Sequence, residues 1–107
     1  MKNFSVLMSF YKNENPNTLK LSLKSIVDQK LKPTEIILVQ DGPVNSILRS
    51  VVEEFQVLNN NCKVIELEKN VGLGRALNIG LKECQYDYVA RIAPMSINGT
   101  SFSKHSF

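Results

Sequence analysis

Asp41 is an acidic residue whose surroundings suit ligand binding. It follows the short apolar run of residues 35–39 and precedes Gly42 and Pro43, two residues typical of turns. A carboxylate held by a rigid turn can accept a hydrogen bond from the ring N–H of a base or from a ribose hydroxyl. The alternative is an Asx turn, in which the side chain bonds to its own backbone. Taken alone, the position leaves both interpretations open.

A second segment, Asn70-Val-Gly72-Leu-Gly74, opens an expected helix. Free backbone N–H groups and the helix dipole at such a start favour a phosphate. Arg75 falls in the first helical turn, where its charge opposes the dipole, and a bound anion would relieve that conflict. The alternative is a plain loop whose glycines supply positive φ angles. As a dinucleotide fingerprint the segment fails, because Leu77 stands at the third glycine position.

The rest of the sequence predicts the elements that position these residues. Apolar runs with strand character alternate with segments in which apolar residues recur at helical spacing. Asn17 or Thr18 is the expected N-cap of the first helix, and Pro33 prevents that helix from passing Lys32. Strands are expected at 4–8, 35–39, 64–67 and 86–92; the helical stripes are Leu19, Leu23, Ile26 and Val27, then Ile47, Leu48, Val51, Val52 and Phe55, then Leu73, Ala76, Leu77, Leu81 and Cys84.

This β-α-β-α-β-α-β order predicts an α/β fold with a Rossmann-like, mostly parallel sheet. In such sheets ligands bind beyond the carboxyl ends of the strands. Residues 9–13, 41–43 and 69–75 should therefore lie together, although they are far apart in the chain. We call these three segments the carboxyl-end rim.

Composition limits the possible classes of protein. The 107 residues suffice for one domain, and the net charge of +3 is small. The longest uncharged apolar run, residues 36–39, is too short to span a membrane, and no secretory signal is evident, so a cytoplasmic protein is expected. No aromatic pattern indicates nucleic-acid binding. Cys62 and Cys84 lack the spacing of a zinc or redox motif, and we expect ordinary reduced thiols.

The last segment differs in character. Residues 93–107 contain no acidic residue, four serines and no clear periodicity. We expect one domain over residues 1–92, followed by a loosely ordered tail.

Five stretches then carry a resemblance to a known family. They are residues 4–14, 22–29, 35–42, 68–81 and 86–91. Together they resemble the N-terminal, nucleotide-sugar-binding half of a family 2 glycosyltransferase of the GT-A type. The resemblance is strongest to bacterial transferases that build lipopolysaccharide, capsule or exopolysaccharide.

The resemblance implies roles for particular residues. The loop after the first strand, here Ser9, Phe10 and Tyr11, would lie against the nucleotide, and Asp41 would contact the base or ribose. The family stretch that lines the donor site corresponds here to Asn70, Gly72, Asn78 and Gly80, with Arg75 between them. The implied ligand is a nucleoside-diphosphate sugar, with a UDP-sugar expected, and the implied acceptor is a glycan or a lipid-linked glycan. The expected location is the cytoplasm or the inner face of the membrane.

The chain departs from the family after the fourth expected strand. There the family has Arg, a hydrophobic residue and then Asp-x-Asp-Asp, whose carboxylates hold Mg²⁺ or Mn²⁺. This chain has Arg91-Ile92-Ala93-Pro94-Met95-Ser96, with no carboxylate at the three acid positions. Methyl and thioether groups do not replace the oxygen ligands of a hard cation. We therefore expect neither a metal site nor a catalytic residue in this chain.

The family's second half, which supplies the acceptor site and the general base, has no counterpart here. An inactive fragment is therefore expected, with a non-catalytic nucleotide-binding module as the alternative. Ending after the fourth strand would also expose a sheet edge prone to association. Codons for Asp-Thr-Asp can encode Ala-Pro-Met after loss of one base, so a frameshift is one hypothesis for the change at residue 93. DNA downstream that encodes the second half in another frame would support it.

Overall fold

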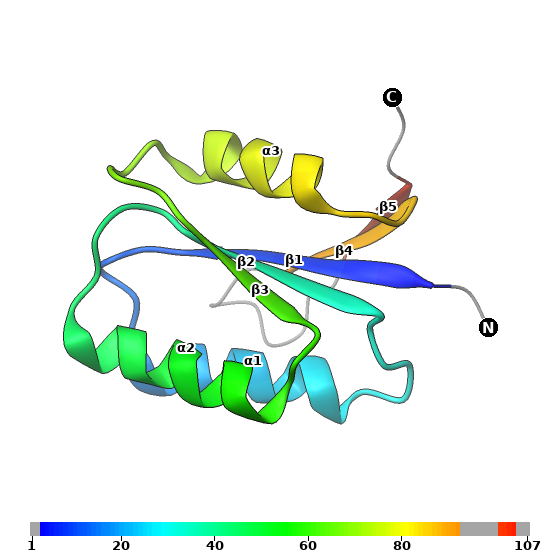
Figure 1. Ribbon diagram of the computed structural model, residues 1–107, viewed down its shortest axis with the longest axis horizontal. Helices are drawn as coiled ribbons and strands as arrows, with labels where there is room; N and C mark the ends of the chain where they lie inside the picture. The colour runs from blue at the N-terminus through cyan, green and yellow to red at the C-terminus, as the bar shows by residue number, and fades with distance from the viewer. Residues whose placement is uncertain (1–2, 93–100, 105–107) are drawn as a thin grey trace.

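A sheet with helices on both faces forms the protein. The computed structural model describes residues 3–92 and 101–104. The strands lie in the order β3-β2-β1-β4-β5 (Figure 1). The elements are β1 (Phe4–Phe10), α1 (Pro16–Asp28), β2 (Glu35–Gln40), α2 (Ser46–Leu58), β3 (Cys62–Glu66), α3 (Leu73–Glu83), β4 (Tyr88–Ile92) and β5 (Ser101–Lys104). The first four strands are mutually parallel, which confirms the expected Rossmann-like α/β fold.

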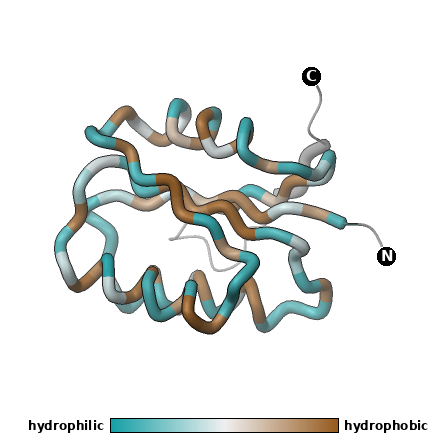
Figure 2. The backbone as a smooth tube through the Cα atoms, viewed as in Figure 1, coloured by the Kyte–Doolittle hydropathy of each residue, from teal (hydrophilic) through white to brown (hydrophobic). Residues whose placement is uncertain are grey.

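The two central strands are buried on both faces because helices cover each side. Helices α1 and α2 lie on one face of the sheet and α3 on the other (Figure 1). Successive residues of a strand point to opposite faces. Along β1, Val6 and Met8 therefore pack on the α1–α2 side, whereas Leu7 packs on the α3 side. Hydrophobic residues accordingly run along the strands and alternate with hydrophilic residues along the helices (Figure 2).

Gly80 lets α3 approach the sheet closely. A Cβ atom at this position would lie 2.4 Å from Leu7 Cδ1 and 2.6 Å from Val39 Cγ2. The close fit fixes the position of α3 over β1 and β2, and hence the place where α3 begins at the rim.

The expected start of the first helix is wrong. Its N-cap is Asn15, not Asn17 or Thr18, and Asn15 Oδ1 accepts hydrogen bonds from the N–H groups of Asn17 and Thr18. Pro16 takes the first helical position, where its fixed φ is favourable and a missing N–H costs nothing. Apolar spacing could not reveal this start, since residues 15–18 include no buried apolar side chain.

Two residues expected on buried helical stripes are exposed. Ile47 of α2 and Leu73 of α3 are 61% and 59% exposed, respectively. Ile47 lies about 100° around α2 from the fully buried Leu48, so it is turned away from the sheet, and Leu73 is the first residue of α3. The buried α2 residues are Leu48, Val52 and Phe55.

The parallel ladder also shifts several expected strand boundaries. β3 begins at Cys62 because Cys62 pairs with Ile36, and it ends at Glu66 beside Gln40. β1 extends two residues beyond the expected Met8, and β4 begins at Tyr88 rather than Tyr86. Backbone pairing sets these ends, and it does not require apolar side chains.

Strand β5 was not expected from the sequence. It pairs antiparallel with β4, with Tyr88 opposite Lys104 and Arg91 opposite Ser101. The edge of β4 is therefore paired along these residues, where the sequence suggested an exposed edge. The expected boundary at residue 92 stays a prediction, and residues 93–100 and 105–107 lie outside the described part of the chain.

Candidate functional site

Adjacent parallel strands bring distant parts of the chain to one rim. Phe10 pairs with Gln40, and the N–H of Asp41 donates to the carbonyl of Phe10 at 2.8 Å. The N–H of Leu67, just after β3, donates to the carbonyl of Gln40 at 3.0 Å. On the other side of β1, Met8 pairs with Ile92, so β4 ends at the same edge. The carboxyl ends of β1, β2, β3 and β4 therefore lie together at one edge of the sheet.

Asp41 connects the end of β2 to the loop that precedes α3. Its side chain is buried, with Oδ1 accepting from the N–H of Val71 at 2.7 Å and Oδ2 from the N–H of Gly72 at 3.1 Å. The Asn70 amide in turn donates to the Asp41 carbonyl at 3.2 Å. We call these three hydrogen bonds the Asp41–loop contact. They differ from an Asx turn, because their partners lie about thirty residues away in the chain.

Gly42 allows the two segments to approach this closely. Its φ angle is 93°, in the region that favours glycine. A Cβ atom here would lie 2.7 Å from the backbone nitrogen of Asn70. Both the backbone conformation and the space therefore require glycine at this position.

The start of α3 combines a positive φ angle with a nearby carboxylate. Gly72 is the N-cap, with φ 96°, and no side chain caps the helix. The negative charge of Asp41 lies at the two N–H groups just before α3, where the helix dipole favours it. The carboxylate thus already occupies the position that the sequence suggested for a phosphate, and a second anion there would meet its repulsion.

The three residues at the end of β1 lie in different surroundings. Ser9 is buried, and Phe10 is a core residue on the α1–α2 side of the sheet. Tyr11 is 40% exposed, and its carbonyl accepts a hydrogen bond from the N–H of Glu14 at 3.1 Å. Partial burial raises the pKa of the Glu14 carboxyl. Of the three expected nucleotide contacts, Tyr11 offers the side chain most accessible to a ligand.

Arg75 and Asn78 are both exposed on α3, but at different distances from the rim. Arg75 belongs to the first turn, three residues after the N-cap Gly72. Asn78 lies in the middle of the helix, two residues from each of the buried residues Ala76 and Gly80. At 100° per residue, Asn78 is on the side of α3 opposite to those residues. The fold therefore places Arg75 near Asp41 and Gly72, and it places Asn78 away from them.

Comparison with known proteins decides the family. The model of the family described as "Glycosyl transferase family 2" matches residues 5–92, the segment that contains β1 to β4 and the carboxyl-end rim. The chain belongs to glycosyl transferase family 2.

Its relatives include glycosyltransferases of polysaccharide biosynthesis. The chain is 43% identical over 98 residues to the UDP-Gal:alpha-D-GlcNAc-diphosphoundecaprenol beta-1,3-galactosyltransferase of Escherichia coli, covering 92% of this chain and 35% of that protein. It is 45% identical over 89 residues to the amylovoran biosynthesis glycosyltransferase AmsE of Erwinia amylovora, covering 83% and 33%, respectively. The chain thus spans about a third of the length of these relatives.

Solved structures of glycosyltransferases share this fold. Residues 1–349 of TarS from S. aureus, in complex with UDP, superpose with a TM-score of 0.72 at 26% identity, covering 88% of this chain and 28% of that one. The mannosyltransferase PcManGT of Pyrobaculum calidifontis, in complex with GDP-Man and Mn²⁺, gives a TM-score of 0.74 at 19% identity, covering 87% and 27%. The second likeness concerns the fold alone.

The described residues of this family 2 chain do not fit a divalent cation. Over residues 3–92 and 101–104 the structure contains no group of three His, Cys, Asp or Glu residues that could hold a metal ion. The three positions where the family resemblance implies carboxylates, Ala93, Met95 and Ser96, lie outside the described residues. None of the three offers a charged oxygen ligand.

The two cysteines lack the character of nucleophiles. Both thiols are free, and burial raises the pKa of Cys62 to about 12 and that of Cys84 to about 11. They therefore stay protonated at neutral pH, as expected of ordinary reduced thiols. Within the described part of the chain, no helix has the length and apolar character needed to cross a membrane.

Sequence reasoning missed Gln40. Its side chain is only 5% exposed although it is polar. It lines a hollow of about 260 Å³, together with Arg49 and Glu66. The available signal was a polar residue at the end of a continuous apolar run, directly before Asp41.

Proposed function

We propose that the carboxyl-end rim binds the nucleoside part of a nucleoside-diphosphate sugar. The observation that supports this most is the Asp41–loop contact, which joins the β2 end to the start of α3. Next to this contact, Tyr11 from the segment 9–13 offers an exposed aromatic ring, and Arg75 from the segment 69–75 offers an exposed cation. Because Asp41 already carries a negative charge at the start of α3, a neutral base or ribose fits beside it better than a diphosphate.

Under this proposal, Asp41 is mainly a positioning residue. Its two carboxylate oxygens hold the N–H groups of Val71 and Gly72, and this contact fixes the loop next to the ligand. The exposed guanidinium of Arg75 is free to approach the diphosphate, since Arg75 forms no ion pair within the described residues. Tyr11 offers a ring face for the base.

We further propose that the intact transferase acts in the assembly of a surface polysaccharide. The printed name of the Escherichia coli relative includes UDP-Gal and a diphosphoundecaprenol-linked sugar. By likeness, a UDP-sugar donor and a lipid-linked acceptor are the first substrates to test. A lipid-linked acceptor would bring the reaction to a membrane surface, in agreement with the expected location.

The present chain is proposed to bind a donor without transferring its sugar. In the intact family a divalent cation supplies charge stabilisation to the departing diphosphate, a contribution of several kcal/mol. The described residues do not fit such a cation, and Ala93, Met95 and Ser96 carry no charged oxygen. Nucleotide-sugar binding without turnover is therefore the function that the site supports best.

Titration calorimetry with UDP tests this proposal. UDP is expected to bind the chain with the same affinity in Mn²⁺ and in EDTA, because the carboxylates that would couple metal and diphosphate are missing. UDP-galactose should remain intact after prolonged incubation with the chain. Inorganic diphosphate serves as the control ligand and should bind more weakly than UDP. Affinity that rises at least about tenfold with Mn²⁺ would contradict the proposal, since that change corresponds to about 1.4 kcal/mol of metal-coupled binding.

A further inference from the structure

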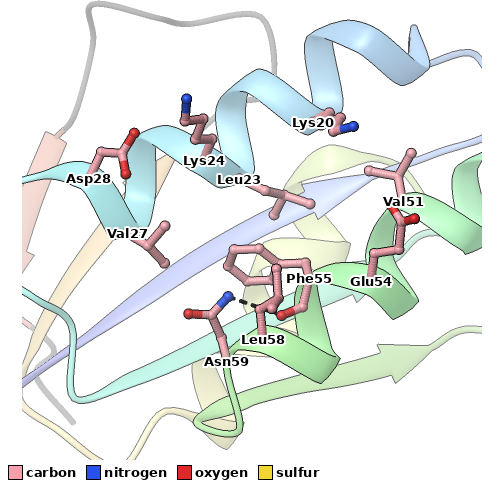
Figure 3. A pocket seen from close by; sticks show the side chains of 10 residues that line it. All are labelled: Lys20, Leu23, Lys24, Val27, Asp28, Val51, Glu54, Phe55, Leu58 and Asn59. Atoms are coloured by element: carbon pink, nitrogen blue, oxygen red, sulfur yellow. Dashed lines mark hydrogen bonds between the residues drawn. The ribbon is translucent and has the colours of Figure 1, made fainter.

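An apolar groove runs between α1 and α2, away from the carboxyl-end rim. It has a volume of about 350 Å³ (Figure 3). The buried side chains of Leu23 and Phe55 form its floor, and the half-buried Val27 and Val51 lie at its sides. The groove is open on the side of the helices that faces away from the sheet. Nothing in the proposed nucleotide site uses it.

The α2 side of this groove carries more apolar surface than the core requires. Leu58 lines the groove and is 83% exposed, although it belongs to a regular helix. Ile47, Val51 and Leu58 are spaced by four and seven residues, so they share one side of α2. Val51 is half-buried against the core, whereas Ile47 and Leu58 are exposed and lie outside the buried stripe that packs on the sheet. Exposed apolar surface of this kind is typical of an interaction site.

Opposite charges lie on the two walls of the groove. Lys20 and Lys24 lie on α1, and Glu54 lies on α2 across from them (Figure 3). No ion pair within the described residues involves any of these three side chains. Together with Asp28, which also lines the groove, the charges sum to zero. An anionic lipid surface would therefore gain no net attraction here.

A second copy of the same chain complements this pattern. In a two-fold symmetric dimer the same patch contacts itself, so α1 of each subunit can lie across α2 of the other. Lys20 and Lys24 then face Glu54 of the partner subunit, and the two-fold symmetry repeats this contact. The apolar stripe of each α2 covers the groove of the other subunit, and Leu58 leaves the solvent.

We propose that the α1–α2 groove is the interface of a homodimer of this chain. The interface lies on the outer surface of α1 and α2, the two helices that cover one face of the sheet. It is separate from the start of α3, which lies on the opposite face (Figure 1).

Sedimentation equilibrium of the full chain and of two lysine variants tests the interface. The wild-type chain is expected to show a monomer–dimer equilibrium. Leu58→Lys should raise the dissociation constant by at least about tenfold, because truncating or charging a central apolar contact typically costs a factor of this size. Val57→Lys is the matched control: Val57 is 84% exposed and adjacent, but it does not line the groove. Its dissociation constant should stay within about twofold of the wild-type value.

Charge reversal distinguishes a specific interface from unspecific hydrophobic association. Lys24→Glu and Glu54→Lys should each weaken the dimer, and the double variant should restore much of the lost affinity. Circular dichroism should show the same melting temperature for the monomeric fraction of every variant, since the replaced side chains are exposed.

Three outcomes would overturn the proposal. The first is a wild-type chain that stays monomeric at every concentration tested. The second is an equal effect of the Leu58 and Val57 substitutions, which would indicate unspecific association. The third is Leu58-dependent binding to vesicles of phosphatidylglycerol with no self-association, which would assign the groove to a lipid surface.

Discussion

Replacement of Asp41 by alanine is expected to lower the free energy of unfolding by about 3 kcal/mol. The variant loses two hydrogen bonds from buried or half-buried N–H groups to a charged oxygen, each contributing about 1.5–3 kcal/mol, and water at the exposed loop recovers part of the loss. The same variant should bind UDP at least about tenfold more weakly, because the loop before α3 is released from β2. Urea denaturation and titration calorimetry measure the two effects.

Two further variants separate the role of Asp41 from general effects of charge. Asp41→Asn keeps one acceptor oxygen but presents an NH₂ group to the second N–H, so its effects should be intermediate. Asp87→Ala removes an exposed carboxylate that has no hydrogen-bond partner among the described residues. This variant should change neither the free energy of unfolding nor the affinity for UDP. If Asp41→Ala abolished UDP binding without any loss of stability, a direct ligand contact would replace the positioning role proposed here.

Replacement of Gly42 by alanine is expected to cost about 3–4 kcal/mol of unfolding free energy. A φ angle of 93° is unfavourable for alanine by roughly 1–2 kcal/mol. The added methyl group would also lie 2.7 Å from the backbone nitrogen of Asn70, and overpacking of this kind costs about 1–3 kcal/mol. Since backbone cannot rotate away as a side chain can, the Asp41–loop contact must open. Urea denaturation gives the change in stability.

Two other glycines of the same region provide matched controls. Gly72 has nearly the same φ angle, 96°, with ψ 156°, but nothing lies within 4 Å of its Cβ position, so Gly72→Ala should cost only the conformational part, about 1–3 kcal/mol. Gly74 is helical and also has open space, so Gly74→Ala should stabilise the protein by roughly 0.5–1 kcal/mol. Equal costs at Gly42 and Gly72 would show that the close approach to Asn70 has no energetic weight.

The order of the elements could be predicted from sequence because each one has a strong local pattern. Continuous apolar runs predicted β1 and β2, which are covered on both faces, and helical spacing predicted α1, α2 and α3. The common position of residues 9–13, 41–43 and 69–75 also followed, since the carboxyl ends of parallel strands share one edge. Local patterns of this kind need no knowledge of tertiary contacts.

The partners of Asp41 could not be predicted in the same way. The sequence indicated a carboxylate at a turn, but its hydrogen bonds to Val71 and Gly72 depend on how β3 aligns beside β2. The positive φ angle of Gly72 was anticipated as an alternative, whereas the close approach at Gly42 was not. Strand β5 was missed because its pairing with β4 comes from the backbone, which leaves no apolar periodicity to detect.

The chemistry of the site, like the fold, could be predicted from the sequence only where it depends on local motifs and not on tertiary contacts. The family motif and its missing carboxylates are visible in the sequence, and they argue against a metal-assisted transfer by this chain. The electrostatic consequence of Asp41 becomes visible only in the structure. Its charge at the start of α3 changes the expected ligand contact at that point from a phosphate to a neutral group.

The most direct test of the proposed nucleotide site is a titration of the ¹⁵N-labelled chain with UDP, followed by amide chemical shifts. The largest changes are expected at Tyr11, at Asp41 and Gly42, and from Gly72 to Arg75, with little change at Val27 and Leu58 in the α1–α2 groove. Changes concentrated in that groove, or none at a saturating concentration of UDP, would contradict the proposed nucleotide site.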